Sequence, residues 1–425
     1  MADRADPDWV LMFSGSPWRA AAHRQHALAR QLAADHRVLF VDPPGNRPHW
    51  RCGVRPVADS IWHAVPPSPL PYGRQLPPVN QLTRRLTSTW LRRWLDRRPG
   101  PRLLWLDEDL AAPVVGELGE RAVVYDATDL DWTFTRRWNR WHLRRGLRDA
   151  VGAADLVLAS SSALPERLPP SRRPAVVLPN GCDPDRFTPD GPSASWLDRL
   201  PRPRLGYLGA IDSRAFDAEL VAGVARSRPD WTFVLVGPAT PAGYAPLRGL
   251  ANVRLFDAVP YADAPAVLRG CDVGLIPYRV GGLIDYVHPK KCYEYLAVGK
   301  PVVATPLPAL ARLAASAAGP VRLAGDVPAF VAAVSAALRE AHHPDEFARR
   351  RAVAVANSWS VRGDQLRGLL TELSAGPGTG PEPAGSSGPA GSSGPAGPSE
   401  PSWPGGGPSG GAARPGAPAE PVVTR

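Results

Sequence analysis

The chain has 425 residues, too many for one ordinary hydrophobic core, and its 44% hydrophobic residues suffice for two domains of roughly 150 to 200 residues each. Its 50 Lys and Arg exceed its 40 Asp and Glu, and the net charge of +10 fits an anionic substrate, an anionic membrane face or nucleic acid. The four cysteines are scattered without a C-x-x-C pair, which argues against a zinc site and a disulfide framework and fits a reducing compartment.

The N-terminal segment MADRADPDWVLMF has acidic flanks and an apolar run of only five residues. It therefore lacks the basic region and the longer apolar region of a signal peptide. No stretch of the sequence approaches the roughly 18 apolar residues that span a bilayer. We expect a soluble globular protein of the cytoplasm.

Short apolar runs alternate with amphipathic stretches through the first half of the chain. A helix-like stretch, 19–33, separates the first two runs. This alternation is typical of a parallel sheet with crossover helices. The predicted strands of this half are 9–13, 37–41, 103–106, 122–126, 155–159 and 175–178.

The second half repeats the pattern after a turn-rich segment, LPNGCDPDRFTPDGPSAS, which we interpret as an inter-domain linker near 180–198. The sequence thus predicts an α/β protein with two doubly wound, Rossmann-like domains that face each other across a cleft. Ligands of such sheets bind at the carboxyl ends of the strands, so the cleft is the expected site. The predicted strands of this half are 204–209, 232–237, 253–256, 272–278 and 302–304.

The C-terminal part has two segments. Residues 359–374 have the pattern of a closing amphipathic helix. Beyond them the chain is mainly Gly, Pro, Ser and Ala, so it cannot bury enough apolar surface to offset its ordering entropy, and we expect a disordered tail. The expected divisions of the chain are 1–185, 199–358, the helix 359–374 and the tail 375–425.

The stretch DYVHPKKCYEYLAVGKPVVAT, residues 285–305, holds every lysine of the chain, whereas all other basic residues are arginine. Pro289 suits the first position of a helix, and Gly299 with Pro301 ends one. Residues 289–298 are therefore predicted to be helical, followed by a buried strand.

On this predicted helix, Lys290 and Lys291 lie four and three residues before Glu294. The two ammonium groups therefore share a face with the carboxylate near the helix N-terminus, where backbone N–H groups also point outward. An anion bound there would meet both. The alternative is a solvated Lys/Glu ion pair.

Two basic stretches of the first half are rich in tryptophan, 82–99 and 135–148. Their composition suits helices that rest on an anionic membrane face and bring a lipid-linked acceptor to the cleft. The alternative is ordinary amphipathic helices whose Trp side chains pack on the sheet. The basic residues form no recognised nucleic-acid-binding module, so we expect no nucleic acid partner.

Several motifs together resemble a known family. In the second half these are GYLGAIDSR, FVLVGP, NVRLFDAVPYADAPAVLRGCDVGLIPY and PKKCYEYLAVGKPVVAT, with PNGCDPDRF at the linker. In the first half they are SPWRAAAHRQHALARQLA, VLFVDPP and VVYDATD. Over about residues 8–373 the chain resembles glycosyltransferases of the GT-B fold, family 4 (group 1), especially those of bacterial cell-surface polysaccharide assembly.

The resemblance implies a site for a nucleotide-diphosphate sugar in the second domain. Glu294 is implied to accept hydrogen bonds from the ribose, and Arg214 and Lys291 to bind the diphosphate and stabilise its developing charge. Gly206 and Gly209 bracket a turn where the backbone can approach a phosphate, although structural turns have the same pattern.

The sequence departs from the family at a second glutamate, which many members carry eight residues before the ribose-binding one. That position is Tyr286 here, with Asp285 one residue off register. Either Asp285 substitutes after a local shift, or backbone groups and His288 hold the donor sugar. Lys290, beside the motif lysine, is expected to be a solvated neighbour.

Candidates in the first half surround the start of its first long helix and the end of one strand. Trp18 and Arg24 are acceptor-side candidates, and His23 could orient the acceptor or stabilise the leaving phosphate, unless it is an ordinary helix-surface histidine. Asp126 and Asp129 end a strand at the expected cleft, or they serve as a helix cap and a turn.

We therefore expect a glycosyltransferase that moves a sugar from a nucleotide-diphosphate sugar to a cell-surface glycan or lipid-linked acceptor, with retention as the resemblance implies. No His and carboxylate cluster has metal-ligand spacing, so we expect no essential metal and no cofactor. A nucleotide-sugar epimerase of the same fold is the enzyme alternative. A catalytically inactive membrane-surface or scaffold protein is the other, motivated by the missing glutamate and the long tail. For the transferase itself we expect a cytoplasmic location, with a peripheral position on the inner membrane face as the alternative.

Overall fold

The computed structural model describes residues 8–19, 23–72, 74, 76–128, 137–282, 284–315 and 319–375. Residues 1–377 form one compact unit, to which all elements described here belong. Asp129 and the expected tail, apart from Ala375, lie outside the described residues. Among the described residues, no helix is both long and apolar enough to cross a bilayer.

The first sheet has eight strands in the order β3-β4-β2-β1-β5-β6-β7-β8. Neighbouring strands are parallel except β3 and β4, which pair antiparallel. In the register of β1, Val10 lies between Val38 and Leu103. The strands are β1 (Trp9–Phe13), β2 (Arg37–Val41), β3 (Gly53–Ala58), β4 (Ile61–Val65), β5 (Arg102–Leu106), β6 (Ala122–Ala127), β7 (Leu156–Ala159) and β8 (Val176–Val177).

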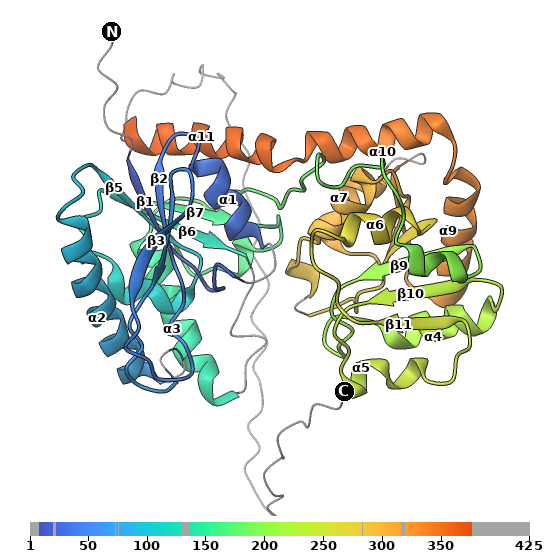
Figure 1. Ribbon diagram of the computed structural model, residues 1–425, viewed down its shortest axis with the longest axis horizontal. Helices are drawn as coiled ribbons and strands as arrows, with labels where there is room; N and C mark the ends of the chain where they lie inside the picture. The colour runs from blue at the N-terminus through green and yellow to red at the C-terminus, as the bar shows by residue number, and fades with distance from the viewer. Residues whose placement is uncertain are drawn as a thin grey trace, which may run out of the picture. The chain divides into compact units, whose positions relative to one another are not determined.

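Helices cover both faces of this sheet, because its central strands are apolar on both faces. Side chains alternate across a strand, so Trp9, Leu11 and Phe13 lie in one hydrophobic cluster and Val10 and Met12 in another. Residues of α2 and α3 complete the first cluster, and residues of α1 and α11 complete the second (Figure 1). These helices are α1 (Arg24–Leu32), α2 (Pro77–Leu95), α3 (Arg137–Ala153) and α11 (Trp359–Ala375).

The second sheet has six parallel strands in the order β11-β10-β9-β12-β13-β14. The strands are β9 (Arg204–Leu208), β10 (Thr232–Val236), β11 (Val253–Phe256), β12 (Val273–Ile276), β13 (Val302–Ala304) and β14 (Val321–Leu323). The helices are α4 (Ala218–Ser227), α5 (Pro241–Tyr244), α6 (Ala264–Arg269), α7 (Lys290–Ala297), α8 (Ala311–Ala314), α9 (Val327–Glu340) and α10 (Pro344–Ala356).

After α10 the chain returns to the first sheet, as the orange helices of Figure 1 show. The Trp359 backbone N–H donates to the Cys182 carbonyl at 2.8 Å. Leu366 and Leu370 of α11 then pack in the cluster that contains Val10. The last helix thus completes the core of the first sheet.

In each sheet the chain first adds strands on one side of a central strand and later on its other side, so the strand order reverses there. The central strands are β1, between β2 and β5, and β9, between β10 and β12. Loops that leave such neighbouring strands at their carboxyl ends diverge and open a crevice for ligands. The expected crevices therefore lie at the ends of β1 and β5 and of β9 and β12.

The predicted α/β class with two doubly wound sheets is confirmed, and the predicted strands agree within one or two residues at their ends. Sequence analysis missed β3, β4 and β14. β3 is an edge strand with mostly exposed side chains and contains Pro56, so it lacks a strand-like apolar run. Pro289 is the N-cap of α7 rather than its first residue, and α1 begins only at Arg24.

Candidate functional site

Two adjacent cavities lie at these loops, and His23 and Lys290 line both of them. The first, here called the Lys291 cavity, has a volume of about 420 Å³, and the second, the Tyr261 cavity, about 480 Å³. The Lys291 cavity is lined by Gly15, Ser16, His23, Arg24, Gln25, Asp107, Thr128, Asn180, Tyr278, Val287, His288, Pro289, Lys290 and Lys291. The Tyr261 cavity is lined by Trp18, Arg19, His23, His26, Ala27, Arg30, Asp183, Arg186, Val259, Pro260, Tyr261, Lys290 and Trp359.

The first sheet contributes the loops after β1 and β5 to the Lys291 cavity. Asp107 directly follows β5, and its Oδ1 accepts a hydrogen bond of 2.5 Å from the Gly15 N–H. The Ser14 hydroxyl donates to the Ser16 carbonyl at 2.8 Å. These bonds fix the loop after β1 at the crevice that the strand order predicts.

Lys291 lies across the cavity, on the first turn of α7. Its Nζ donates a hydrogen bond of 2.9 Å to the Tyr278 hydroxyl and lies 4.7 Å from the centre of the Tyr207 ring. Burial opposes the charged form, but Tyr207, Tyr278 and Glu294 together outweigh it, so the pKa of Lys291 is raised above its ordinary value. Lys291 therefore offers the cavity a permanent positive charge.

Gly209 allows Lys291 to approach the loop after β9. Its φ of 151° is a backbone conformation that residues other than glycine rarely adopt. A Cβ at this position would overlap the Lys291 Nζ and lie 3.1 Å from the Tyr207 hydroxyl. Gly206 is different, because it lies inside β9, where a Cβ would come within 2.6 Å of the Cys271 Sγ. Gly206 therefore serves packing.

Glu294 lies behind the wall of the Tyr261 cavity, with 9% of its side chain exposed. Its Oε1 accepts a hydrogen bond of 2.7 Å from the Tyr261 hydroxyl and lies 3.3 Å from the Lys290 Nζ. The expectation that Lys290 is a solvated neighbour is therefore wrong. The four-residue spacing places Lys290 over Glu294, whereas Lys291 is turned toward the tyrosines of the neighbouring strands.

Arg24 and Asp126 form a buried ion pair near the end of β6. The Arg24 Nε and Nη2 each lie 2.9 Å from an Asp126 oxygen, and the Asp126 side chain is fully buried. The Arg24 Nη1 also donates to the Asn180 Oδ1 at 3.2 Å, and the Asn180 Nδ2 donates to the His288 carbonyl at 2.8 Å. Asp126 is thus an ion-pair partner, and it acts on the Lys291 cavity through Arg24.

Histidines and a tryptophan pack at the start of α1. The backbone N–H of His23, the N-cap residue, donates to the His26 Nδ1 at 3.3 Å, and the His26 Nε2 lies 3.2 Å from the Pro17 carbonyl. Burial lowers the pKa of His26 to about 4, and burial followed by the charge of Lys290 lowers the pKa of His23. Trp18 lies 5.4 Å from the His26 ring, centre to centre. His26 is therefore neutral near pH 7.

Asp285 and His288, the two residues considered in place of the missing glutamate, have different surroundings. Asp285 belongs to the 3₁₀ turn η6 (Ile284–Tyr286), and its Oδ1 accepts a hydrogen bond of 2.9 Å from the Gly281 N–H. His288 lines the Lys291 cavity and is 7% exposed. Burial, followed by Arg24 and Arg362, lowers the pKa of His288 to about 4. A neutral imidazole thus stands at the cavity wall.

Arg214 lies on the loop after β9, with 66% of its side chain exposed. Its guanidinium lies 3.8 Å from the Asp212 carboxylate. The backbone N–H of Arg214 donates to the Asp212 Oδ1 at 2.8 Å. Arg214 is not part of the wall of either cavity. The side chain would have to turn to meet an anion bound beside Lys291.

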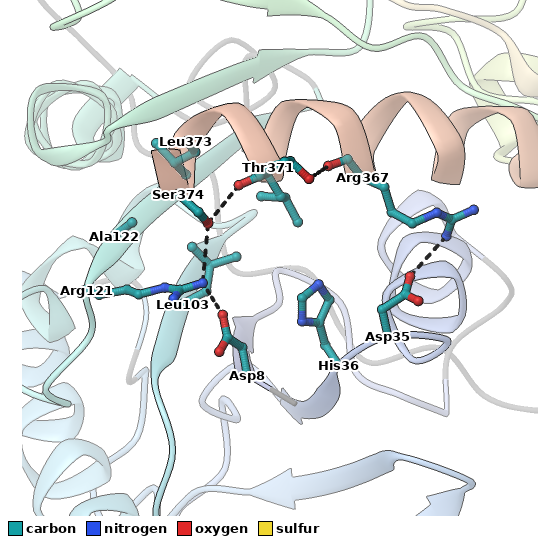
Figure 2. Close-up of a pocket in the computed structure, with 11 residues that line it drawn as sticks. Asp8, Asp35, His36, Leu103, Arg121, Ala122, Arg367, Thr371, Leu373 and Ser374 are labelled. Carbon is teal, nitrogen blue, oxygen red and sulfur yellow. Dashed lines mark hydrogen bonds and ion pairs between the residues drawn. The ribbon is translucent and has the colours of Figure 1, made fainter. Parts of the chain in front are cut away.

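A further cavity, of about 580 Å³, lies at the amino-terminal edge of the first sheet, under the last turns of α11 (Figure 2). Asp8, His36 and Arg121 from this edge line it. Its charges are paired within the wall, since Arg121 contacts Asp8 and Arg367 lies 3.5 Å from Asp35. Sheets of this type bind ligands at the opposite edge, so we do not include this cavity in the candidate site.

Sequence analysis missed the residues that hold the charged groups of the site in place. Each lies inside one of the motifs that carry the family resemblance, and this position is the sequence signal that could have identified them. Their partners lie between 13 and 156 residues away, so spacing along the chain could not pair them. The missed residues are Tyr207, Tyr261, Tyr278 and Asn180.

The chain matches known proteins in sequence. Residues 202–340 match the family described as Glycosyl transferases group 1. TuaH of Bacillus subtilis (strain 168), a glycosyltransferase named for teichuronic acid biosynthesis, is 28% identical over 208 residues, or 45% of this chain and 52% of that protein. The chain therefore spans about half the length of this curated relative.

Solved structures share the fold. A sucrose-phosphate synthase from Thermosynechococcus elongatus has a TM-score of 0.68 at 17% identity, over 87% of this chain and 99% of that one. HepE from Anabaena, solved in complex with UDP, has a TM-score of 0.60 at 15% identity, over 86% and 100%. An E. coli trehalose-6-phosphate protein bound with UDP-2-fluoro glucose has a TM-score of 0.61 at 13% identity, over 86% and 99%.

At these identities the solved structures show the fold alone. The family match covers the elements from β9 to α9. Both agree with the resemblance carried by the sequence motifs. Residues 202–340 therefore match the group 1 glycosyl transferases, and the chain has the fold of these solved structures.

Proposed function

We propose that this protein transfers a glycosyl unit from a nucleotide-diphosphate sugar to a cell-surface glycan or lipid-linked acceptor. The observation that carries the proposal is the position of Lys291, a cation held by two tyrosines where the crevices of both sheets meet. The Lys291 Nζ is hydrogen-bonded to a phenol hydroxyl at the cavity wall, and a partly buried cation in this position favours an anionic ligand such as a diphosphate.

The donor extends through both cavities in this proposal. Its nucleoside lies in the Tyr261 cavity, where Glu294 accepts hydrogen bonds from the ribose. Its diphosphate lies beside Lys291 and Gly209, with Arg214 turning in from its loop. HepE and the E. coli protein, solved with UDP and with UDP-2-fluoro glucose, support a nucleotide donor.

In transfer with retention, the bond from the sugar C1 to the diphosphate oxygen breaks, and a bond from C1 to the acceptor oxygen forms on the same face. The departing diphosphate takes the proton of the acceptor hydroxyl. Lys291 and Arg214 stabilise the charge that develops on the leaving group, which lowers the barrier electrostatically. His288 contacts the donor sugar from the cavity wall, and His23 hydrogen-bonds the leaving phosphate or the acceptor.

The acceptor approaches from the first sheet. Arg24, fixed by Asp126, lines the Lys291 cavity, and Trp18 lines the neighbouring one. The likeness to TuaH, a protein named for teichuronic acid biosynthesis, supports an acceptor of the cell-surface glycan type. The charge of Lys291 does the work that a metal ion would do on the diphosphate, so the proposal includes no essential metal.

An anionic membrane face is the proposed docking surface for a lipid-linked acceptor. Trp141 of α3 is 63% exposed, and Arg144, Arg145 and Arg148 are exposed on the same helix. On α2, by contrast, Trp94 packs against the core of the first sheet. This agrees with the alternative in which the Trp side chains of an amphipathic helix pack on the sheet. Exposed Trp beside Arg suits the interface of an anionic bilayer.

The first test is a thermal-shift panel of UDP-, GDP-, ADP- and dTDP-sugars, repeated with Glu294→Ala and Lys291→Ala. We expect one nucleotide class to raise the melting temperature and both substitutions to abolish the effect. No stabilisation of the wild-type chain would contradict the proposal and favour an inactive scaffold. Conversion of the donor to an isomer without any acceptor would identify an epimerase instead.

A further inference from the structure

Lys290 stands at the junction of the two cavities, and its side chain forms part of both walls. Its Nζ lies 3.3 Å from the Glu294 Oε1 and 4.6 Å from the centre of the Tyr261 ring. His23, from the other side of the junction, lines the same two cavities. The ammonium group therefore lies between the proposed nucleoside region and the proposed diphosphate region.

Glu294 is covered by two side chains in this arrangement. The Tyr261 hydroxyl and the Lys290 ammonium both contact its Oε1, and only 9% of the Glu294 side chain is exposed. Glu294 itself lines neither cavity whereas Lys290 lines both, so a ribose reaches this carboxylate from the cavities where the ammonium gives way. The tyrosine can remain, because a carboxylate has lone pairs on both oxygens.

We propose that Lys290 exchanges partners when a nucleoside diphosphate binds: its ammonium leaves Glu294 for the diphosphate, and the ribose hydroxyls take its place on the carboxylate. This inference rests on the proposed function, which assigns ribose and diphosphate to these cavities. It gives Lys290 a specificity role, because a nucleoside without phosphates has to displace the ammonium without offering it a new partner.

The chemistry of lysine suits this exchange. Its compact charge sits on a flexible stem, whereas arginine holds a carboxylate with a planar fork. Outside residues 290–300 every basic residue of the chain is arginine. Lys290 is also the first residue of α7, and 29% of its side chain is exposed, so a change of rotamer does not disturb the core.

Isothermal titration calorimetry can measure the exchange. The full chain is titrated with UDP, GDP, ADP and dTDP and with the matching nucleosides, and the ratio of the two Kd values is taken for the base that binds. In Lys290→Met we expect the nucleoside to bind about threefold to tenfold tighter, because the competing cation is gone. The diphosphate should bind about tenfold weaker, so the ratio falls by about 30-fold or more.

Three further variants sharpen the result. Lys290→Gln repeats the test with a polar side chain, so that the outcome does not depend on the folding of one variant. Lys290→Arg keeps the charge but holds Glu294 with a planar fork, so the nucleoside should bind weaker than to wild type and the ratio should not fall. Tyr261→Phe removes the other contact of Glu294 and should change both affinities by the same factor.

The exchange is overturned if Lys290→Met weakens nucleoside and diphosphate equally, since Lys290 would then be a fixed contact. It is also overturned if both affinities stay unchanged. A wild-type chain that binds none of the four diphosphates contradicts the proposed function itself and removes the basis of the exchange. The two failures are therefore distinguishable.

Discussion

The Lys291 Nζ occupies the space that a Cβ at Gly209 would fill. The cation on α7 therefore rests directly against the loop after β9, and the Tyr207 and Tyr278 rings flank it. A backbone turn and a charged side chain from a distant helix are thus placed by one contact. The proposed diphosphate site depends on both.

Gly209→Ala is expected to lower the free energy of unfolding by about 1–3 kcal/mol, because alanine is strained at this φ. It should also weaken binding of the donor nucleotide at least about tenfold, because Lys291 has to move away from Tyr278. Urea denaturation and calorimetry measure the two effects. Gly368→Ala is the matched control, because this glycine lies on an exposed face of α11 with nothing within 4 Å of an added Cβ. Unchanged nucleotide affinity in Gly209→Ala would rule out the role of the contact.

Asp126→Asn tests whether Asp126 acts through Arg24. The substitution leaves a buried guanidinium without its carboxylate and should cost about 3–5 kcal/mol in the free energy of unfolding. The double variant Arg24→Met/Asp126→Leu removes both charges and should lose less stability than Asp126→Asn. Urea denaturation measures both. A stable Asp126→Asn variant that loses only acceptor binding would show a direct contact with the acceptor instead.

The sequence predicted the sheets well because their central strands are buried on both faces. Runs such as Val10 to Phe13 are then apolar at every position, and this pattern is local. The antiparallel edge made by β3 and β4 carries no such run, and β14 is only three residues long. These strands form because a neighbouring strand is already in place, which local sequence does not reveal.

The candidate site was predictable in its charged residues and not in their partners. Lys290 and Lys291 are both placed by helical spacing to face Glu294. Which of them pairs with it depends on Tyr278, which takes up Lys291, and on Tyr261, which lies beside Lys290. Those tyrosines come from the loops after β11 and β12, so the assignment required the fold.

The free energy of unfolding is expected to fall as the pH decreases from about 6.5 to about 4. Burial lowers the pKa of His26 and of His288 to about 4, whereas an unfolded histidine titrates near 6.5. Between these values the unfolded chain binds more protons than the folded chain, so stability rises with pH. Each histidine contributes up to about 3 kcal/mol, which is complete above the unfolded pKa and lost near the folded one.

Urea denaturation across this pH range, with wild type and His26→Gln, measures the contribution of His26. The variant should show a shallower dependence on pH than wild type. His342→Gln is the matched control, because the His342 side chain is 80% exposed. Equal slopes for wild type and His26→Gln would contradict a buried neutral His26.

Removal of divalent metals by EDTA is expected to change donor affinity and turnover by less than about twofold, because Lys291 supplies the charge that faces the diphosphate. Calorimetry with the nucleoside diphosphate and a product assay measure the two quantities. A matched sample with added Mg²⁺ or Mn²⁺ is the control. Activity that EDTA abolishes and either ion restores would refute the metal-independent site.

The exposed face of α3 is expected to bind anionic vesicles. A triple variant, Arg144→Gln/Arg145→Gln/Arg148→Gln, should reduce co-sedimentation with vesicles that contain phosphatidylglycerol at least about tenfold, since each basic residue near such a surface contributes about 1 kcal/mol. Trp141→Ser should weaken the binding at high salt, where the apolar contact remains. Equal loss in a control triple on the second sheet would show that total charge, and not this face, drives binding. The control residues, all exposed, are Arg226, Arg248 and Arg254.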